Sequence, residues 1–291
     1  KKAISLKPNY AQAYYNMGVA LHKLDKLDKA IEAYTKALLI KPDYADAFYN
    51  MGFTFQEQGK LEEAIEAYTK VLSISPDYGD AYLNLGGVLN DITFKRPNKD
   101  LQNIITQMLE KRSNVRPKDI AKAAISFLKL DPNLQKNLQM ADVHRVNQNP
   151  LDIISDLNKL PLLLKLMAVS PIPDLELEKL FKYIRKSILD YVSSLNEISH
   201  ELLRFQSALA LQCFTNEYIY TETKSEEKVL ELLEKKVERS LRKNKQPSPH
   251  LILALASYKA LKHYEWVSSL FLTDEIRDVY NRQVGEPIYE E

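Results

Sequence analysis

The chain has 291 residues, of which 45% are hydrophobic and 27% charged, an ordinary composition for a folded globular protein. Its 40 Lys and Arg residues nearly balance its 39 Asp and Glu residues, so the overall charge disfavours a nucleic-acid partner. The single cysteine, Cys213, excludes an intrachain disulfide framework, and no apolar run approaches the roughly 20 residues that span a bilayer. We therefore expect a cytoplasmic protein with neither a nucleic-acid nor a membrane partner.

The first part of the sequence repeats itself at a constant spacing of 34 residues. The phrase YNMG occurs at 15–18 and again at 49–52, and LNLG follows at 83–86. Four kinds of residue coincide at this spacing: Pro8, Pro42 and Pro76; Tyr10, Tyr44 and Tyr78; Asn16, Asn50 and Asn84; and Gly18, Gly52 and Gly86. A fixed period in this range is typical of a solenoid, in which each repeat packs only on its neighbours.

Each repeat predicts two helices joined by a short turn. Segments 11–23 and 28–40 both place apolar residues at helical spacing, so each helix has one apolar side. In the next repeat the turn contains Gly59, which suits a helix C-terminus. The prolines that close the repeats stop the second helix, because a proline inside a helix costs about 3 kcal/mol. Small residues such as Gly18 and Ala30 allow the two helices to approach closely.

These residues resemble the tetratricopeptide repeat (TPR) family over residues 1 to about 91. After Leu89 the pattern fails, because Asn98 and Gln102 stand where the family has a small residue and a tyrosine. The resemblance implies an all-α fold with a short TPR solenoid over 1–94: the end of one repeat, two full repeats and the first helix of a third. A second, irregular all-helical domain is expected to follow.

TPR solenoids bind peptides on a concave face lined by the first helix of each repeat, and the resemblance implies such a face here. Its expected residues are Gln12, Tyr15, Asn16, Val19, Lys23, Asp46, Tyr49, Asn50, Phe53, Glu57, Asp80 and Asn84, with His22, Gln56, Leu83, Gly87, Asn90 and Asp91 beside them. The three asparagines resemble the ladder in the TPR superhelix of the O-linked N-acetylglucosamine transferases. An asparagine amide carries both donors and an acceptor, so it can pair with the backbone of many peptides. Alternatively, these asparagines bond neighbouring helices of the solenoid.

The remainder of the chain predicts helices separated by prolines. It has no glycine between Val88 and Val284, which disfavours strands and phosphate-binding loops. Connecting helices and a polar loop at 134–150 are expected within 95–149, with Asn98 as an N-cap. A helical domain is expected over 150–291. Its helices are predicted near 151–157, 160–169, 174–193, 199–219, 225–243, 249–262, 264–271 and 273–283.

Two features indicate the core of this second domain. Leu177, Phe181, Ile184 and Ile188 mark one buried stripe, and HLILALASYKAL is apolar on most faces, so it is expected to lie centrally. Cys213 stands in the apolar phrase LQCF and is expected to be a buried, inert thiol.

Residues 98–291 resemble the helical region of large bacterial proteins in which TPRs precede a class I S-adenosylmethionine-dependent methyltransferase domain. The phrases that carry the resemblance are ALALQCFTNEYIYTET at 208–223, LALASYKAL at 253–261 and QVGEPIYEE at 283–291. The chain lacks the glycine-rich turn and the alternating strands and helices of the methyltransferase itself. The resemblance therefore implies a non-catalytic, substrate-recruiting part of a larger enzyme, with no catalytic, cofactor-binding or metal-binding residue in this chain.

Two other stretches resemble functional motifs only in part. The stretch SHELLRF has Arg204 where a zinc-protease motif needs a second histidine, so it predicts no metal site. The basic stretch KKVERSLRKNK at 235–245 complements the dipole at a helix C-terminus and is interpreted as a solvated helix end rather than a nucleic-acid patch.

The sequence thus predicts a protein–protein interaction module whose partner is a protein or a peptide. Three alternatives stay open: a purely structural piece that self-associates through its open solenoid ends, the TPR region of a glycosyltransferase-like protein, or a helical domain that is itself an enzyme.

Overall fold

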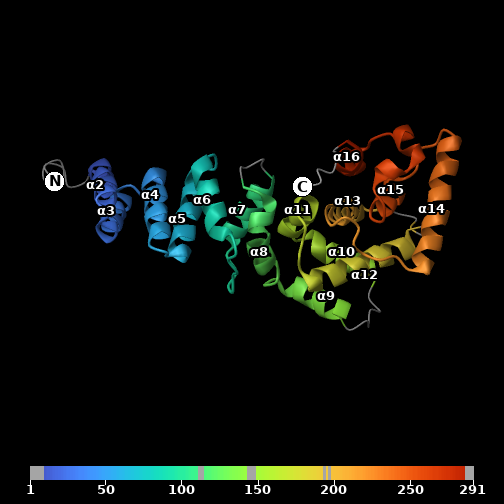
Figure 1. Ribbon diagram of the computed structural model, residues 1–291, viewed down its shortest axis with the longest axis horizontal. Coiled ribbons are helices and arrows are strands. Elements are labelled where there is room, and N and C mark those ends of the chain that lie inside the picture. The colour runs from blue at the N-terminus through green and yellow to red at the C-terminus, as the bar shows by residue number, and fades with distance from the viewer. Residues whose placement is uncertain (1–9, 111–114, 143–148, 193–194, 196–197, 286–291) are drawn as a thin grey trace. The chain divides into compact units, whose positions relative to one another are not determined.

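The computed structural model describes residues 10–110, 115–142, 149–192, 195 and 198–285 (Figure 1). Over these residues the chain forms helices and connecting segments with no strand, so the all-α prediction is confirmed. The chain divides into two compact units, Lys1–Phe94 with Asn98–Ala123, and Lys95–Pro97 with Ala124–Glu291. The expected connecting segment 95–149 is thus shared between the two units, and the expected partial repeat before Tyr10 lies outside the described residues.

The first unit is a row of antiparallel helix pairs. Its helices are α2 (Ala11–Lys23), α3 (Leu27–Ile40), α4 (Ala45–Glu57), α5 (Leu61–Ile74), α6 (Gly79–Leu89), α7 (Lys99–Glu110) and the first half of α8 (Pro117–Leu128). Helix α2 packs on α3 and α4 on α5, while α3 also contacts α4 and α5 contacts α6 (Figure 1). This arrangement confirms the predicted solenoid of helix-turn-helix repeats. Gly59 ends one turn with a positive φ of 72°, the conformation for which glycine is suited.

In the first two helix pairs a glycine of one helix faces a tyrosine of the other. A Cβ added to Gly18 would lie 2.5 Å from a ring carbon of Tyr34, and one added to Gly52 would lie 3.0 Å from the ring of Tyr68. Both tyrosines are buried, with 1% and 0% of their surface exposed. The aromatic ring of the partner helix therefore fills the space that a side chain at each glycine would need.

In the third repeat a residue from outside the repeat pattern takes the place of the tyrosine. A Cβ on Gly86 would lie 2.7 Å from both methyl carbons of Val115. Val115 reaches this position because the chain first forms α7, which begins at the predicted N-cap: the Asn98 side chain accepts from the backbone N–H of Leu101 at 3.0 Å. Lys122 of α8 then pairs with Asp91 at 3.1 Å, next to the end of α6. The solenoid is thus continued by residues that no longer follow the 34-residue pattern.

The second unit contains the remaining helices. They are α9 (Pro132–Asp142), α10 (Pro150–Asn158), α11 (Pro161–Val169), α12 (Leu175–Tyr191), α13 (His200–Thr215), α14 (Lys224–Arg242), α15 (Pro249–Ala256) and α16 (Asp274–Tyr280), with 3-10 turns at Leu261–His263 and Glu265–Ser269 and a π turn at Asn281–Gly285. The helices predicted near 249–262 and 264–271 are therefore wrong in part, because the chain leaves helix after Ala256 and continues in short turns. Over the described residues, no helix joins enough length to enough apolar sequence to cross a lipid bilayer.

The polar loop predicted at 134–150 is wrong over its first half. Helix α9 occupies residues 132–142 and packs against α12. Its apolar residues Leu134, Leu138 and Ala141 recur at helical spacing and are 0%, 8% and 7% exposed, so this short stripe outweighs the polar composition. Residues 143–148 of the predicted loop lie outside the described residues.

The core of the second unit lies where the sequence indicates it. The stripe Leu177, Phe181, Ile184 and Ile188 is buried along α12. Every residue of α15 from His250 to Ala256 is buried, as expected for a helix that is apolar on most faces. Cys213 is fully buried as well, and burial raises the pKa of its thiol to about 12.

A buried cation lies among tyrosines in this unit. The Arg185 guanidinium carbon lies 4.0 Å from the ring centre of Tyr258 and 5.3 Å from that of Tyr220. Its Nη2 donates to the backbone oxygen of Tyr220 at 3.3 Å, while Nε and Nη1 find no partner among the described residues. Tyr258 in turn donates to the buried carboxylate of Glu226 at 2.9 Å. Tyr258 therefore contacts both the Arg185 cation, through its ring, and the Glu226 carboxylate, through its hydroxyl group.

Candidate peptide-binding face of the repeats

The residues predicted to bind a peptide lie together on one set of helices. All twelve belong to α2, α4 and α6, which are neighbours in the first unit. Six are exposed, namely Asn16, Lys23, Asp46, Phe53, Glu57 and Asp80, and six are half-buried, namely Gln12, Tyr15, Val19, Tyr49, Asn50 and Asn84. None is buried, so the side chains of these residues reach solvent in the described part of the chain. We call this set of twelve residues the ladder face.

The asparagines of the ladder face bond the helices of the solenoid. The amide nitrogen Nδ2 of Asn50 donates to the Tyr15 hydroxyl at 3.1 Å and to the backbone oxygen of Asp46 at 2.9 Å. Asn84 repeats the first of these bonds one unit later, donating to the Tyr49 hydroxyl at 3.0 Å. The two bonds to tyrosines each join one repeat to the one before it, which is the structural role that the sequence left open as an alternative.

The carbonyl ends of the same amides remain accessible. Within the described residues, the Oδ1 atoms of Asn50 and Asn84 accept no hydrogen bond, although both side chains are only half-buried. Asn16 differs, because its Oδ1 accepts from Gln12 at 3.1 Å and its amide has no such tyrosine before it in the described chain. The bonds to the tyrosines hold two amides in a fixed orientation, in which each presents an acceptor.

Tyrosine rings recur in the same arrangement beside these amides. The Tyr15 ring centre lies 5.1 Å from that of Tyr44, and the Tyr49 ring centre lies 5.1 Å from that of Tyr78. The hydroxyl groups of the two later tyrosines donate in turn, Tyr44 to Gln12 at 2.7 Å and Tyr78 to Asp46 at 3.1 Å. Ring contacts and hydroxyl hydrogen bonds together restrict the orientation of Tyr44 and Tyr78.

Burial favours the protonated form of Tyr15 and Tyr44. Burial raises the pKa of Tyr15, the nearby Asp46 carboxylate raises it further, and the bond from Asn50 offsets part of the rise. Burial also raises the pKa of Tyr44. A neutral hydroxyl group can accept, as that of Tyr15 does from Asn50, or donate, as that of Tyr44 does to Gln12.

Apolar and acidic side chains complete the surface around the ladder. Phe53 and Leu83 are 37% and 40% exposed, so they offer two apolar contacts for a partner. The imidazole of His22 lies 2.7 Å from the Glu57 carboxylate and 5.6 Å from the Phe53 ring centre. The exposed acids of α4 and α6 are Asp46, Glu57 and Asp80, whereas the exposed cation of α2 is Lys23, so the face carries more negative than positive charge.

The family comparison matches the first unit. The tetratricopeptide repeat model matches residues 11–44 and 45–78. Residues 11–78 contain two tetratricopeptide repeats. These TPRs have the boundaries that the 34-residue spacing predicts, and the ladder face lies on their first helices and on α6, which follows them.

Three solved structures are similar to this chain at low scores. YrrB, described as a TPR protein with an unusual peptide-binding site, is 18% identical with a TM-score of 0.33, over 74% of this chain and 91% of that one. PilF of Pseudomonas aeruginosa is 18% identical with a TM-score of 0.28, over 80% and 95%. The TPR domain of P58(IPK) is 16% identical with a TM-score of 0.28, over 80% and 68%. No curated protein matches the chain.

Two tyrosines of the site have no role in the sequence-based prediction. Tyr44 and Tyr78 repeat at the 34-residue spacing and were assigned no binding role, yet their hydroxyl groups hold Gln12 and Asp46 in place. The signal was present in their period. What the period does not reveal is that a residue before the first helix of a repeat bonds back to the helix of the preceding one.

Proposed function

We propose that the ladder face binds an extended segment of a protein or peptide, and that this interaction is the function of the first unit. The observation that carries the proposal is the pair of oriented amides: Asn50 and Asn84 each donate to a tyrosine and leave Oδ1 open on the same surface. An extended chain presents backbone N–H groups along its length, and these are donors of the kind that Oδ1 accepts.

The chemistry of the face favours a particular class of segment. Phe53 of the ladder face and Leu83 beside it offer apolar contact, and the acids Asp46, Glu57 and Asp80 favour basic side chains. A single hydrogen bond contributes only about 1 kcal/mol net, and an exposed ion pair contributes about the same or less. Useful affinity therefore needs both oxygens and both apolar contacts together, with a partner that carries apolar and basic residues.

The test selects peptides from a random displayed library on this chain and measures their affinity by fluorescence anisotropy. The double variant Phe53→Ala with Leu83→Ala removes both apolar contacts, and we expect it to weaken binding by roughly tenfold or more. Leu39→Ala is the matched control, because Leu39 is 78% exposed on α3 and does not belong to the ladder face. Equal affinity of the double variant and the parent chain would place the binding site elsewhere.

We further propose that this recruiting role serves a larger cytoplasmic S-adenosylmethionine-dependent methyltransferase, with the chain holding the methyl acceptor. The support is the resemblance of 208–223 and 253–261 to the helical region beside such domains. Reading the coding sequence downstream tests it, since a strand followed by a glycine-rich turn is expected there. An open reading frame that ends without such a domain would contradict the proposal. Titration of this chain with S-adenosylmethionine is expected to release no heat.

A further inference from the structure

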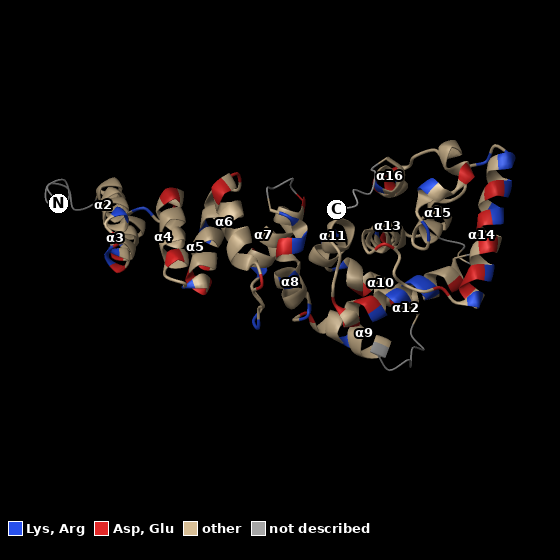
Figure 2. Cartoon of the chain, viewed as in Figure 1, with Lys and Arg blue, Asp and Glu red and all other residues tan. Residues whose placement is uncertain are grey.

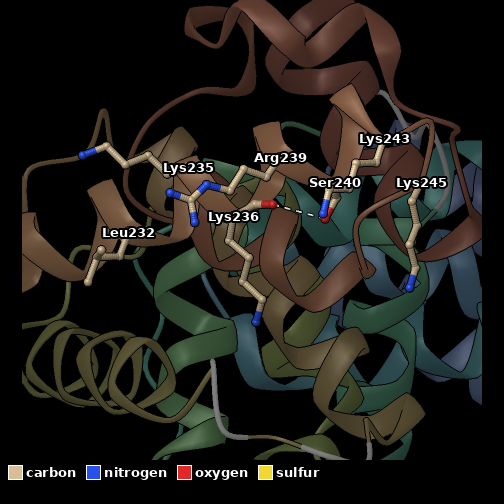
Figure 3. A pocket seen from close by; sticks show the side chains of 7 residues that line it. All are labelled: Leu232, Lys235, Lys236, Arg239, Ser240, Lys243 and Lys245. Carbon is tan, nitrogen blue, oxygen red and sulfur yellow. Dashed lines mark hydrogen bonds between the residues drawn. The ribbon is translucent and has the colours of Figure 1, made fainter.

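The outer surface of α14 carries separate stripes of opposite charge. Basic and acidic residues alternate along the sequence of α14 (Figure 2). By helical position, the exposed Glu227 and Glu231 and the half-buried Glu234 and Glu238 fall on one side of the helix, whereas Lys235, Lys236, Arg239 and Lys243 fall on another. With about 100° between successive residues, Lys236, Arg239 and Lys243 follow Leu232 at positions that return to one narrow strip. These side chains, with Ser240 and Lys245, line a hollow of about 320 Å³. Figure 3 shows how they lie.

Most of these cations have no anionic partner. Lys235 lies 3.9 Å from Glu231, and the neighbouring Arg242 lies 3.4 Å from Glu238, so pairs form only where the two stripes meet. In the part of the chain that the structure describes, Lys236, Arg239, Lys243 and Lys245 form no ion pair. These four unneutralised cations line one hollow, so they repel one another, and a polyanionic partner would remove that repulsion.

The strip is held on a rigid support. Leu233 and Val237, on the opposite side of α14, are buried in the core of the second unit. The start of the helix is fixed by a capping box between Thr223 and Glu226. The buried side and the capped start hold α14 in one orientation, in which the charged side chains face solvent.

Exposed apolar side chains stand within and beside the basic strip. Leu232 is 67% exposed and lines the same hollow as the cations. Phe271 is 75% exposed, and its backbone N–H donates to the Gln246 side chain at 3.0 Å, which ties it to the segment just after α14. Gln246 also donates to the backbone oxygen of Ser269 at 3.1 Å, so the connection is made twice.

We propose that Leu232, Lys235, Lys236, Arg239, Lys243 and Lys245, with Phe271 beside them, form a surface that binds the anionic headgroups of a phospholipid membrane. We call it the basic face. Cations attract the negatively charged lipids while leucine and phenylalanine side chains enter the headgroup and acyl boundary. A nucleic-acid backbone would use the cations but gives Leu232 no apolar partner. The sequence-based expectation of no membrane partner considered only spanning segments, and the basic face lies on a surface.

Vesicle sedimentation tests the basic face with the full chain. We expect binding to vesicles that contain about 30% phosphatidylserine and little binding to pure phosphatidylcholine vesicles. The triple variant Lys236→Gln, Arg239→Gln and Lys243→Gln is expected to bind the anionic vesicles roughly 100-fold more weakly, because each cation near such a surface accounts for about fivefold. The control is Lys29→Gln, Lys36→Gln and Lys70→Gln, which makes the same charge change at exposed positions of the first unit and is expected to bind normally.

A second pair of measurements separates lipid from other polyanions. The variant Leu232→Ser with Phe271→Ser keeps every cation, so we expect it to lose affinity for the anionic vesicles. Anisotropy with a labelled DNA duplex and with polyglutamate is expected to show weaker binding, unaffected by this variant. Circular dichroism must show each variant folded. Equal binding to neutral and anionic vesicles, or tight binding to DNA or polyglutamate without binding to vesicles, would overturn the proposal.

Discussion

The side-chain amide of Asn84 donates a 3.0 Å hydrogen bond to the hydroxyl group of Tyr49, one repeat earlier in the chain. Asn50 and Tyr15 make the same contact at 3.1 Å. The asparagines therefore stabilise the stack of repeats, and the same bonds orient the oxygens with which we expect them to bind a peptide. A structural and a binding role are compatible at one residue because the amide has two chemically different ends.

The asparagines are expected to differ in their effect on stability. Asn50→Ala removes the bond to Tyr15 and should lower the free energy of unfolding by about 1 kcal/mol, whereas Asn16→Ala removes no bond between repeats and should change it little. Urea denaturation measures both. A double-mutant cycle of Asn50→Ala with Tyr15→Phe should give a coupling energy of about 1 kcal/mol. Additive effects in that cycle would show that the bond contributes nothing to folding.

Adjacent glycines in α6 are expected to respond oppositely to alanine. Gly86→Ala places a methyl group 2.7 Å from Val115 and should destabilise the first unit by roughly 1–3 kcal/mol. Gly87→Ala meets nothing within 4 Å and should stabilise it by up to about 1 kcal/mol, because alanine favours the helix. Thermal denaturation compares the two variants.

A compensating change tests the cause of the Gly86 effect. Adding Val115→Ala removes the two methyl groups nearest the new side chain, so the double variant should recover part of the loss caused by Gly86→Ala alone. No recovery would mean that Val115 does not occupy the position that Tyr34 and Tyr68 occupy in the earlier repeats.

The chain is expected to lose stability at alkaline pH. Burial raises the pKa of Cys213 to about 12 from a usual 9.0, and that of Tyr34 to about 12 from 10.0. The folded state thus keeps protons that the unfolded state releases, so this contribution is complete below about pH 9 and is lost as the pH rises toward 12. Urea midpoints measured across this range should fall steadily, and Cys213→Ala should reduce the fall at its lower end. A constant midpoint up to pH 11 or so would contradict this expectation.

Arg185 is expected to be necessary for the second unit even though two of its nitrogens lack partners. Arg185→Ala removes the contact with Tyr258, leaves a cavity and leaves the buried Glu226 without a nearby cation. The loss should be about 3 kcal/mol or more in the free energy of unfolding. Lys182→Ala, at an exposed position of the same helix, should stay within about 0.5 kcal/mol of the parent chain. A small effect at Arg185 would show that its position is tolerated rather than required.

The repeats could be predicted from the sequence because every repeat solves the same packing problem with the same residues. Gly18 and Tyr34 recur as Gly52 and Tyr68, so a self-alignment finds them. Val115 could not be found in this way, since it fills the third tyrosine position from another distance along the chain. The continuation of the solenoid depends on a long-range contact, which a repeat pattern does not encode.

The second unit was predicted less fully for a related reason. Apolar residues at helical spacing predict α12 and α15. The sequence of α9 is mostly polar and its apolar stripe is short, so a loop is predicted there instead. Arg185 stands four residues after Phe181 on an otherwise apolar stripe, a conflict that the sequence contained and that was missed. The basic stretch at 235–245 predicts a solvated helix end, and only the structure separates its cations from the glutamates of α14 and adds Phe271 to them.

Photo-crosslinking tests the role of the ladder face most directly. A photoreactive phenylalanine analogue placed at Phe53 on α4, and separately at Leu39 on α3, is irradiated with a labelled peptide selected on the chain. We expect a covalent adduct at position 53 that excess unlabelled peptide abolishes, and none at position 39. Equal labelling at both positions, or labelling at position 39 alone, would contradict peptide binding by the ladder face.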